Sequence, residues 1–284
     1  MTYKTILVHL ADEHRVPSLL QTAASIARDE GAHLIGLSVI PPTIIVAGTE
    51  GAGDVVIEDH RVRYMEQSAR MRQAMLTVAN EVPGLAHSWR EVDCEAENPF
   101  GIAASVIVAQ SRCADLVVAS QANRSWALSG HLDVVDELVM ESGRPVLMVP
   151  KAGVRSRAIK RAVVAWNGRR EAARAAFDAL PLLARAERVC VVWVDPESEQ
   201  HAAGDLPGID LCEALSRHGI KCEAAPAAGK DGTAGAALLA AADRHDADLL
   251  VMGCYGHSRL REMILGGASR HVLQHARIPV LLSH

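Results

Sequence analysis

The sequence repeats itself once, and this repeat constrains the fold more than any other feature. The segments that begin at Asp115 and at Asp248 both read Asp-Leu, continue as short apolar runs, and are followed about thirty residues later by a Pro-Val-Leu sequence. The two beginnings also match, because Lys4–Ala11 aligns without gaps on Lys160–Asn167. A repeat of this length indicates that each copy is a complete domain.

Each copy has the pattern of a doubly wound α/β domain. In the first copy, apolar runs without polar alternation occupy Thr5–Leu10, Leu34–Ile40, Leu116–Ala119 and Val146–Val149. Such runs are typical of parallel strands covered on both faces, and segments of helical spacing separate them. We therefore expect two tandem doubly wound domains, residues 1–150 and 158–284, each a five-stranded parallel sheet flanked by helices. An insertion from residue 41 to about 59 predicts a surface loop before a long helix near 61–82.

Composition and charge indicate which partners the protein can bind and in which cell compartment we expect it. Of the 284 residues 49% are hydrophobic and 22% charged, the net charge is -5, and no basic block or stripe stands out, which argues against nucleic acid as a partner. The six cysteines form no Cys-x-x-Cys pair, so we expect reduced, partly buried thiols. No apolar run reaches the roughly 20 residues of a membrane span, and the first residues do not resemble a signal peptide. The expected compartment is the cytoplasm, without membrane contact.

Three glycines in the second copy predict a phosphate cradle. Gly253, Gly256 and Gly266 lie between the apolar run Asp248–Met252 and a segment of helical spacing that includes Arg270–His275. Glycines let bare backbone N–H groups approach an anion, and the start of a helix adds partial positive charge there. The alternative is that these glycines only serve tight turns and close helix packing.

The segment Val163–Gly168, the Asp248–Met252 strand, the Gly-x2-Gly-x9-Gly element and the terminal run Ile278–Leu281 together resemble the universal stress protein family. The resemblance covers nearly the whole chain as a tandem pair. It implies a stress-response sensor or adaptor that binds ATP or another adenine nucleotide, with or without Mg²⁺, in its second domain. The family motif has Ser or Thr directly after its last glycine; this chain has Gly267 there, and Ser269 matches a further small or hydroxyl position.

By this resemblance, Asn167 and Val194 contact the nucleoside, whereas the family has an acidic residue where Asn167 stands. The complete set of predicted binding residues is Trp166, Asn167, Val194, Met252, Gly253, Gly256, His257, Arg259, Gly266, Gly267, Ala268 and Ser269. Several have simpler interpretations: Asn167 forms an Asx turn, and His257 and Arg259 are solvated loop residues. In the first copy Ser120–Asn123 replaces Gly253–Gly256, and Asp133 lies opposite Gly267, so we expect that pocket to be closed to ATP.

Other functions compete with this one. If both pockets have decayed, the chain is a protein-interaction module without a nucleotide. Zinc binding would use His271 and His275, four residues apart on one helix, with His284. A flavin electron-transfer role is a third class. No catalytic residues or metal ligands are predicted, and at most slow ATP hydrolysis is expected. For partners we expect an unknown protein, a pseudo-dimer within the chain through Val146–Val149 against Val280–Leu282, and an association of two chains that the sequence leaves open.

Overall fold

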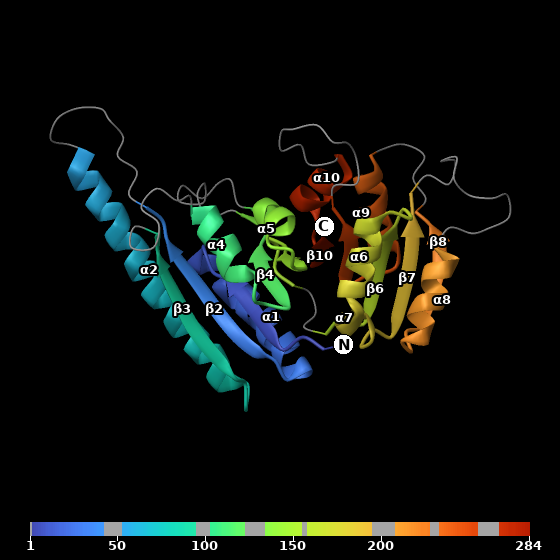
Figure 1. Cartoon of the computed structure of the whole chain (residues 1–284), viewed down its shortest axis with the longest axis horizontal. Coiled ribbons are helices and arrows are strands. Elements are labelled where there is room, and N and C mark those ends of the chain that lie inside the picture. The colour runs from blue at the N-terminus through green and yellow to red at the C-terminus, as the bar shows by residue number, and fades with distance from the viewer. Residues whose placement is uncertain are drawn as a thin grey trace. The chain divides into compact units, whose positions relative to one another are not determined.

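The computed structural model describes residues 2–42, 53–94, 103–122, 134–154, 158–194, 208–227, 233–254 and 267–284, with side chains of the helix at 53–81 described from residue 61. The chain divides into two compact units, Tyr3–Arg144 and Pro145–His284, the second including the first two residues. Both are built from parallel strands and helices (Figure 1). The expected α/β fold class is therefore confirmed.

The first unit is centred on β1 (Thr5–His9). In the described sheet of this unit the strand order is β3-β2-β1-β4, with every neighbouring pair parallel. The core of β1, Ile6–Val8, is fully buried, as expected for a strand covered on both faces. The other strands are β2 (His33–Ile40), β3 (His87–Asp93) and β4 (Leu116–Ser120). The helices are η1 (Glu13–Arg15), α1 (Val16–Glu30), α2 (Gly53–Glu81), α4 (Ala103–Ser111) and α5 (Val135–Glu141).

Helix α2 begins earlier than the sequence pattern indicated. It starts at Gly53, inside the segment expected to be a loop up to about residue 59, while residues 43–52 of that segment lie outside the described part. Even inside a helix a glycine costs only about 1 kcal/mol relative to alanine, so Gly53 at the first position of α2 does not prevent the helix from starting there. Among the described residues, no helix is both long and apolar enough to cross a membrane.

The second unit contains a sheet with the order β5-β10-β9-β6-β7-β8. Its strands are parallel except that β5 runs antiparallel to β10. The strands are β5 (Val146–Val149), β6 (Arg161–Trp166), β7 (Arg188–Trp193), β8 (Cys222–Pro226), β9 (Leu249–Gly253) and β10 (Val280–Ser283). The helices are α6 (Arg170–Asp178), α7 (Leu180–Leu183), α8 (Ile209–Arg217), α9 (Ala234–Arg244) and α10 (Gly267–His275).

Strand β5 pairs with the last strand of the chain, as the sequence predicted. Leu147 lies opposite Leu281, Met148 opposite Val280, and Val146 opposite Leu282. By its contacts this strand therefore belongs to the second unit, although the repeat assigns its sequence to the first copy. The domain limits 1–150 and 158–284 remain a prediction from the repeat.

The repeated Asp-Leu sequences have the same structural role in both units. Asp115 Oδ2 accepts hydrogen bonds from the backbone amides of Lys4 and Thr5, at 2.7 and 2.9 Å. Asp248 Oδ2 does the same for Lys160 and Arg161, at 3.1 and 3.0 Å. In each unit a carboxylate at the start of one strand thus satisfies the first amides of the central strand beside it.

Candidate functional site

The carboxyl ends of β6, β7 and β9 bring predicted segments of the site together. Trp166 ends β6 and lies opposite Trp193, the last residue of β7, which Val194 follows. Strand β9 pairs with the other side of β6 and ends at Gly253. The strands of this sheet are drawn in Figure 1. Because parallel strands end at one edge of a sheet, Asn167, Val194 and Gly253, which end or follow β6, β7 and β9, lie along the same edge of the second unit. Open α/β sheets bind ligands at this edge.

Asn167 forms the turn that leads from β6 into α6. Its Oδ1 accepts a hydrogen bond from the backbone amide of Arg169 at 3.1 Å, which defines an Asx turn. Gly168, between them, has a φ of 69°, a left-handed conformation that favours glycine. Asn167 and Gly168 are both exposed, so the end of β6 is open to solvent. The turn accounts for the local structure at Asn167, and a contact with a nucleoside remains a prediction.

Gly253 lies against the backbone of α6. A Cβ at this position would stand 2.3 Å from the carbonyl carbon of Glu171 and 2.4 Å from the amide nitrogen of Ala172. Real Cβ atoms do not approach backbone atoms so closely, so strand β9 and helix α6 can pack at this distance only because residue 253 is glycine. The close-packing interpretation therefore explains Gly253. Met252, beside it, is buried in the sheet.

Glu171 places a negative charge near Gly253. Its side chain is only 8% exposed and accepts a hydrogen bond from Arg170 Nε at 2.5 Å. Burial acts to raise the pKa of Glu171, but the Arg170 hydrogen bond, its own backbone amide, and the charges of Arg170 and His284 outweigh it and lower the pKa. Glu171 is therefore ionised at neutral pH. A phosphate group at this edge needs positive charge close by to offset it.

Helix α10 begins at the residues predicted to receive the phosphates. Gly267 is exposed, and a Cβ added there would meet no atom of the described residues within 4 Å. Ser269 is 4% exposed, and the first turn packs against α9, since a Cβ on Gly235 would lie 2.7 Å from the carbonyl oxygen of Ala268. The first amides of an α-helix have no partner within the helix, so this terminus can attract an anion. The space at Gly267 leaves the approach open.

Four predicted site residues lie outside the described part of the chain: Gly256, His257, Arg259 and Gly266. They belong to residues 255–266, the middle of the glycine motif. The described residues therefore give both ends of the predicted cradle, the end of β9 and the start of α10. The roles of the four residues between them remain predictions from the sequence.

The corresponding edge of the first unit is covered. Ala11, which aligns with Asn167, is buried, and its carbonyl oxygen accepts a hydrogen bond from Gln67 Nε2 of α2 at 2.6 Å. Asp12 is also buried, and its Oδ1 accepts from the amide of His14 at 2.9 Å. The end of β1 is thus closed by α2 where the end of β6 is open. The two units therefore differ at matching positions, and nucleotide binding by the second one stays a prediction.

The three histidines considered for zinc make other contacts. The rings of His271 and His275 stack with 4.3 Å between their centroids, and His275 Nδ1 lies 2.9 Å from the carbonyl oxygen of His271. His284 Nδ1 lies 3.1 Å from the carbonyl oxygen of Cys254. Within the described residues, the one group of metal-ligand side chains is instead Cys190, Glu223 and His245. Sequence reasoning missed this group because its members come from three elements and share no motif spacing.

Comparison with known proteins places this chain beside the universal stress proteins. Residues 158–284 match the model of the Universal stress protein family. A universal stress protein from Archaeoglobus fulgidus DSM 4304 has the same fold, with a TM-score of 0.68 and 18% identity over 98% of this chain and 95% of that chain. A putative universal stress protein from Pseudomonas aeruginosa UCBPP-PA14 follows with a TM-score of 0.54 and 16% identity over 99% and 93%.

A universal stress protein solved in complex with cAMP covers 45% of this chain and 98% of its own, at 25% identity and a TM-score of 0.35. No curated protein sequence is similar enough to count as a relative.

The fold is that of a doubly wound α/β protein, and in its second unit the carboxyl edge of the sheet is open to solvent at Asn167 and Gly168. Within that class, residues 158–284 match the universal stress protein family model, and nearly the whole chain has the fold of a universal stress protein from Archaeoglobus fulgidus. The resemblance drawn from Val163–Gly168 and the glycine motif is confirmed at this level.

Proposed function

We propose that the chain is a cytoplasmic stress-response sensor or adaptor whose second domain binds ATP or another adenine nucleotide, with or without Mg²⁺. The observation that carries this proposal is the difference between the two units at the same edge. Asn167 and Gly168 are exposed and Gly267 stands in open space, whereas Ala11 and Asp12 are buried beneath α2. The nucleoside would lie near Asn167 and Val194, with its phosphates at the amides of Gly267–Ser269.

The same geometry supports no catalytic step. Among the described residues the carboxylate of Glu171 is engaged by Arg170, and that of Asp178, which accepts a hydrogen bond from Ser283 opposite Gly253, is paired with Arg174. Efficient phosphoryl transfer needs a base for the attacking water and carboxylates that hold Mg²⁺. We therefore propose that occupancy of the site, rather than turnover, is the signal, through its effect on a protein partner.

A pair of isosteric variants tests the site. Gly267→Asp places a carboxylate at the start of α10, where the first copy carries Asp133, and Gly267→Asn places an uncharged group of the same size there. We expect Gly267→Asp to weaken ATP binding in isothermal titration by about tenfold or more, because the new carboxylate repels the phosphates and itself takes the place of an anion at the helix N-terminus, where a negative charge gains up to about 2 kcal/mol. Gly267→Asn should bind almost as the parent chain does.

Gly256→Val tests the part of the motif between the two ends, because a branched side chain crowds the backbone that is predicted to wrap the phosphates. Undiminished affinity in both Gly267→Asp and Gly256→Val would contradict the proposed site. Circular dichroism melts of both variants show whether lost binding reflects lost folding.

The second candidate is a protein-interaction module without a nucleotide. Two observations favour it: helix packing already explains Gly253, and the Asx turn explains Asn167. Native mass spectrometry of the purified full chain separates the two functions, because a retained nucleotide adds its own mass. An unliganded chain that also fails to bind ATP, ADP and AMP in titration would support the interaction module.

A further inference from the structure

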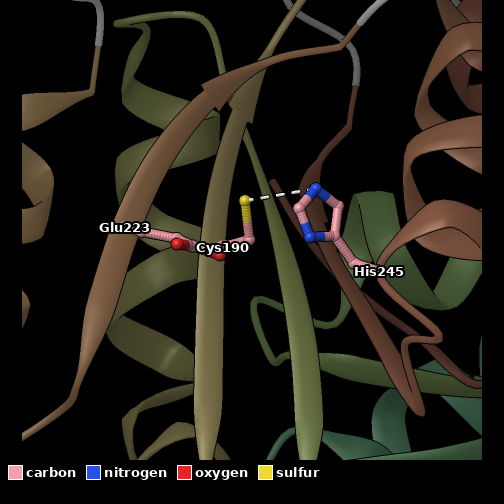
Figure 2. A group of neighbouring side chains, drawn as sticks. All are labelled: Cys190, Glu223 and His245. Atoms are coloured by element: carbon pink, nitrogen blue, oxygen red, sulfur yellow. Dashed lines mark hydrogen bonds between the residues drawn. The ribbon is translucent and has the colours of Figure 1, made fainter.

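A second cluster in the C-terminal unit has the composition of a metal site. Cys190 lies in the middle of β7, and the register places it opposite Glu223 of the neighbouring β8, so both side chains project from one face of the sheet. His245 ends α9, where its backbone amide bonds to the carbonyl oxygen of Ala241 at 3.1 Å. The sulfur, a carboxylate oxygen and a ring nitrogen all lie within 4.8 Å of one another. Figure 2 shows the sulfur of Cys190 directed at the imidazole.

The separation of sulfur and nitrogen suits a tetrahedral ion. Cys190 Sγ lies 3.6 Å from His245 Nε2. Zinc bonds of about 2.3 Å to sulfur and about 2.0 Å to nitrogen, at a tetrahedral angle, place those two atoms about 3.5 Å apart. The two ligands that are held most firmly, one in an inner strand and one at a helix end, therefore already have the required spacing. Glu223 is exposed, so its carboxylate can turn to complete the set.

The charge and softness of the donors also select a class of ion. A thiolate and a carboxylate together carry two negative charges, which balance one divalent cation. Sulfur and imidazole favour zinc, cobalt and their neighbours over magnesium and calcium, which prefer oxygen alone. We propose that Cys190, Glu223 and His245 bind a thiophilic divalent cation of the Zn²⁺ class, with water in the fourth position.

The site is separate from the proposed nucleotide edge. Cys190 and Val194 are four residues apart on an extended strand and its end, which corresponds to about 13 Å. A role for Cys190 as a nucleophile is disfavoured, since burial and then the charge of Glu223 raise its pKa to about 11. The metal proposal therefore stands or falls independently of nucleotide binding.

Two other groups compete for the same ion and must be separated in the test. Cys212 of α8 and Cys222 of β8 have their sulfur atoms 2.8 Å apart. Cys222 precedes Glu223 on the strand, so this thiol pair belongs to the opposite face of β8. His271 and His275 offer imidazole without sulfur. A probe that reports thiolate ligation, combined with single substitutions, distinguishes all three.

The probe is Co²⁺ added to the full chain without an affinity tag, after treatment with a reductant and a chelator. We expect one equivalent of Co²⁺ to give thiolate-to-cobalt charge-transfer absorption together with the strong visible bands of four-coordinate cobalt, and one equivalent of Zn²⁺ to remove both. Cys190→Ser should abolish the charge-transfer absorption. Glu223→Gln and His245→Gln each remove a ligand and should weaken Co²⁺ binding. Loss of a group that only supports a ligand costs about 10- to 100-fold in metal affinity, so we expect a loss at least this large.

Cys212→Ser is the matched control, since it removes a thiol of the same unit from outside the cluster and should leave the cobalt spectrum unchanged. The proposal is overturned if the parent chain shows no charge-transfer absorption, if that absorption survives in Cys190→Ser, or if Cys212→Ser removes it. Should Cys190→Ser fail to fold by circular dichroism, the half-buried His245→Gln variant decides: unchanged cobalt affinity there overturns the site as well.

Discussion

At the scale of single residues, His9 is the ionisable group placed most unusually. It is the last residue of β1 and is 3% exposed, and its Nε2 has no hydrogen-bond partner in the described part of the chain. Burial lowers the pKa of His9 from its ordinary value of 6.5 to about 4. The folded protein therefore keeps this imidazole neutral at pH values where the unfolded chain protonates it.

This difference predicts acid sensitivity that His9→Leu should relieve. Between pH 6.5 and about 4 the unfolded chain binds a proton at residue 9 that the folded chain does not, so stability falls as the pH falls. The loss approaches about 3 kcal/mol near pH 4. Urea unfolding from pH 8 to pH 4.5 should show His9→Leu gaining stability over the parent as pH drops, with a constant difference above pH 7.5. Parallel curves over the whole range would contradict the prediction.

At the scale of elements, the sequence predicted those features that depend on neighbouring residues. Continuous apolar runs located β1, β2, β4 and β5. It could not decide what Gly253 does, because a glycine at a strand end serves a phosphate and a packed helix equally well. The answer depends on how closely α6 approaches β9, which is a property of two segments 80 residues apart in sequence. The start of α2 was missed because glycine is a weak helix breaker.

The two glycines of the candidate site are expected to respond differently to alanine. In Gly253→Ala the new methyl group meets the backbone of Glu171 and Ala172, so β9 and α6 must separate, at a cost of about 3 kcal/mol. Gly267→Ala meets no atom within 4 Å and serves as the control, with a change within about 0.5 kcal/mol. Thermal unfolding of the two variants and the parent chain measures these changes in stability. Equal melting temperatures would show that the approach of α6 to Gly253 is not as close as described.

The group of Cys190, Glu223 and His245 shows a second limit of sequence reasoning. Cys190 and Glu223 become neighbours only through the register of β7 on β8, and His245 joins them only because α9 ends beside that pair. Metal motifs are recognised by fixed spacing along the chain, and these ligands are 33 and 22 residues apart. The sequence contains all three residues, but no short motif indicates that they lie close together in the fold.

At the scale of the whole molecule, the repeat was the best predictor, and its physical basis is now visible. Asp115 and Asp248 hold the first amides of β1 and β6 in the same way, so the repeated Asp-Leu sequence preserves a structural bond. The repeat places the strand Val146–Val149 at the end of the first copy. Contacts place it in the second unit, against β10. A repeat records ancestry along the chain, whereas strand pairing is decided by which edges are apolar and unpaired.

This pairing predicts that a fragment covering only residues 158–284 is less stable than one covering 145–284. Val280–Leu282 are fully buried, and without β5 their apolar side chains and one row of backbone groups become an exposed edge. The shorter fragment should self-associate in size-exclusion chromatography or melt at least about 5 °C lower, the shift expected for a loss of about 1 to 2 kcal/mol in a domain of this size.

Leu147→Pro in the longer fragment is the matched control, because proline removes a backbone donor beside Leu281 and should reproduce the behaviour of the short fragment. If 158–284 and 145–284 are equally monomeric and melt together, β5 adds nothing to the second unit, and the boundary expected from the repeat is also the boundary of the folding unit.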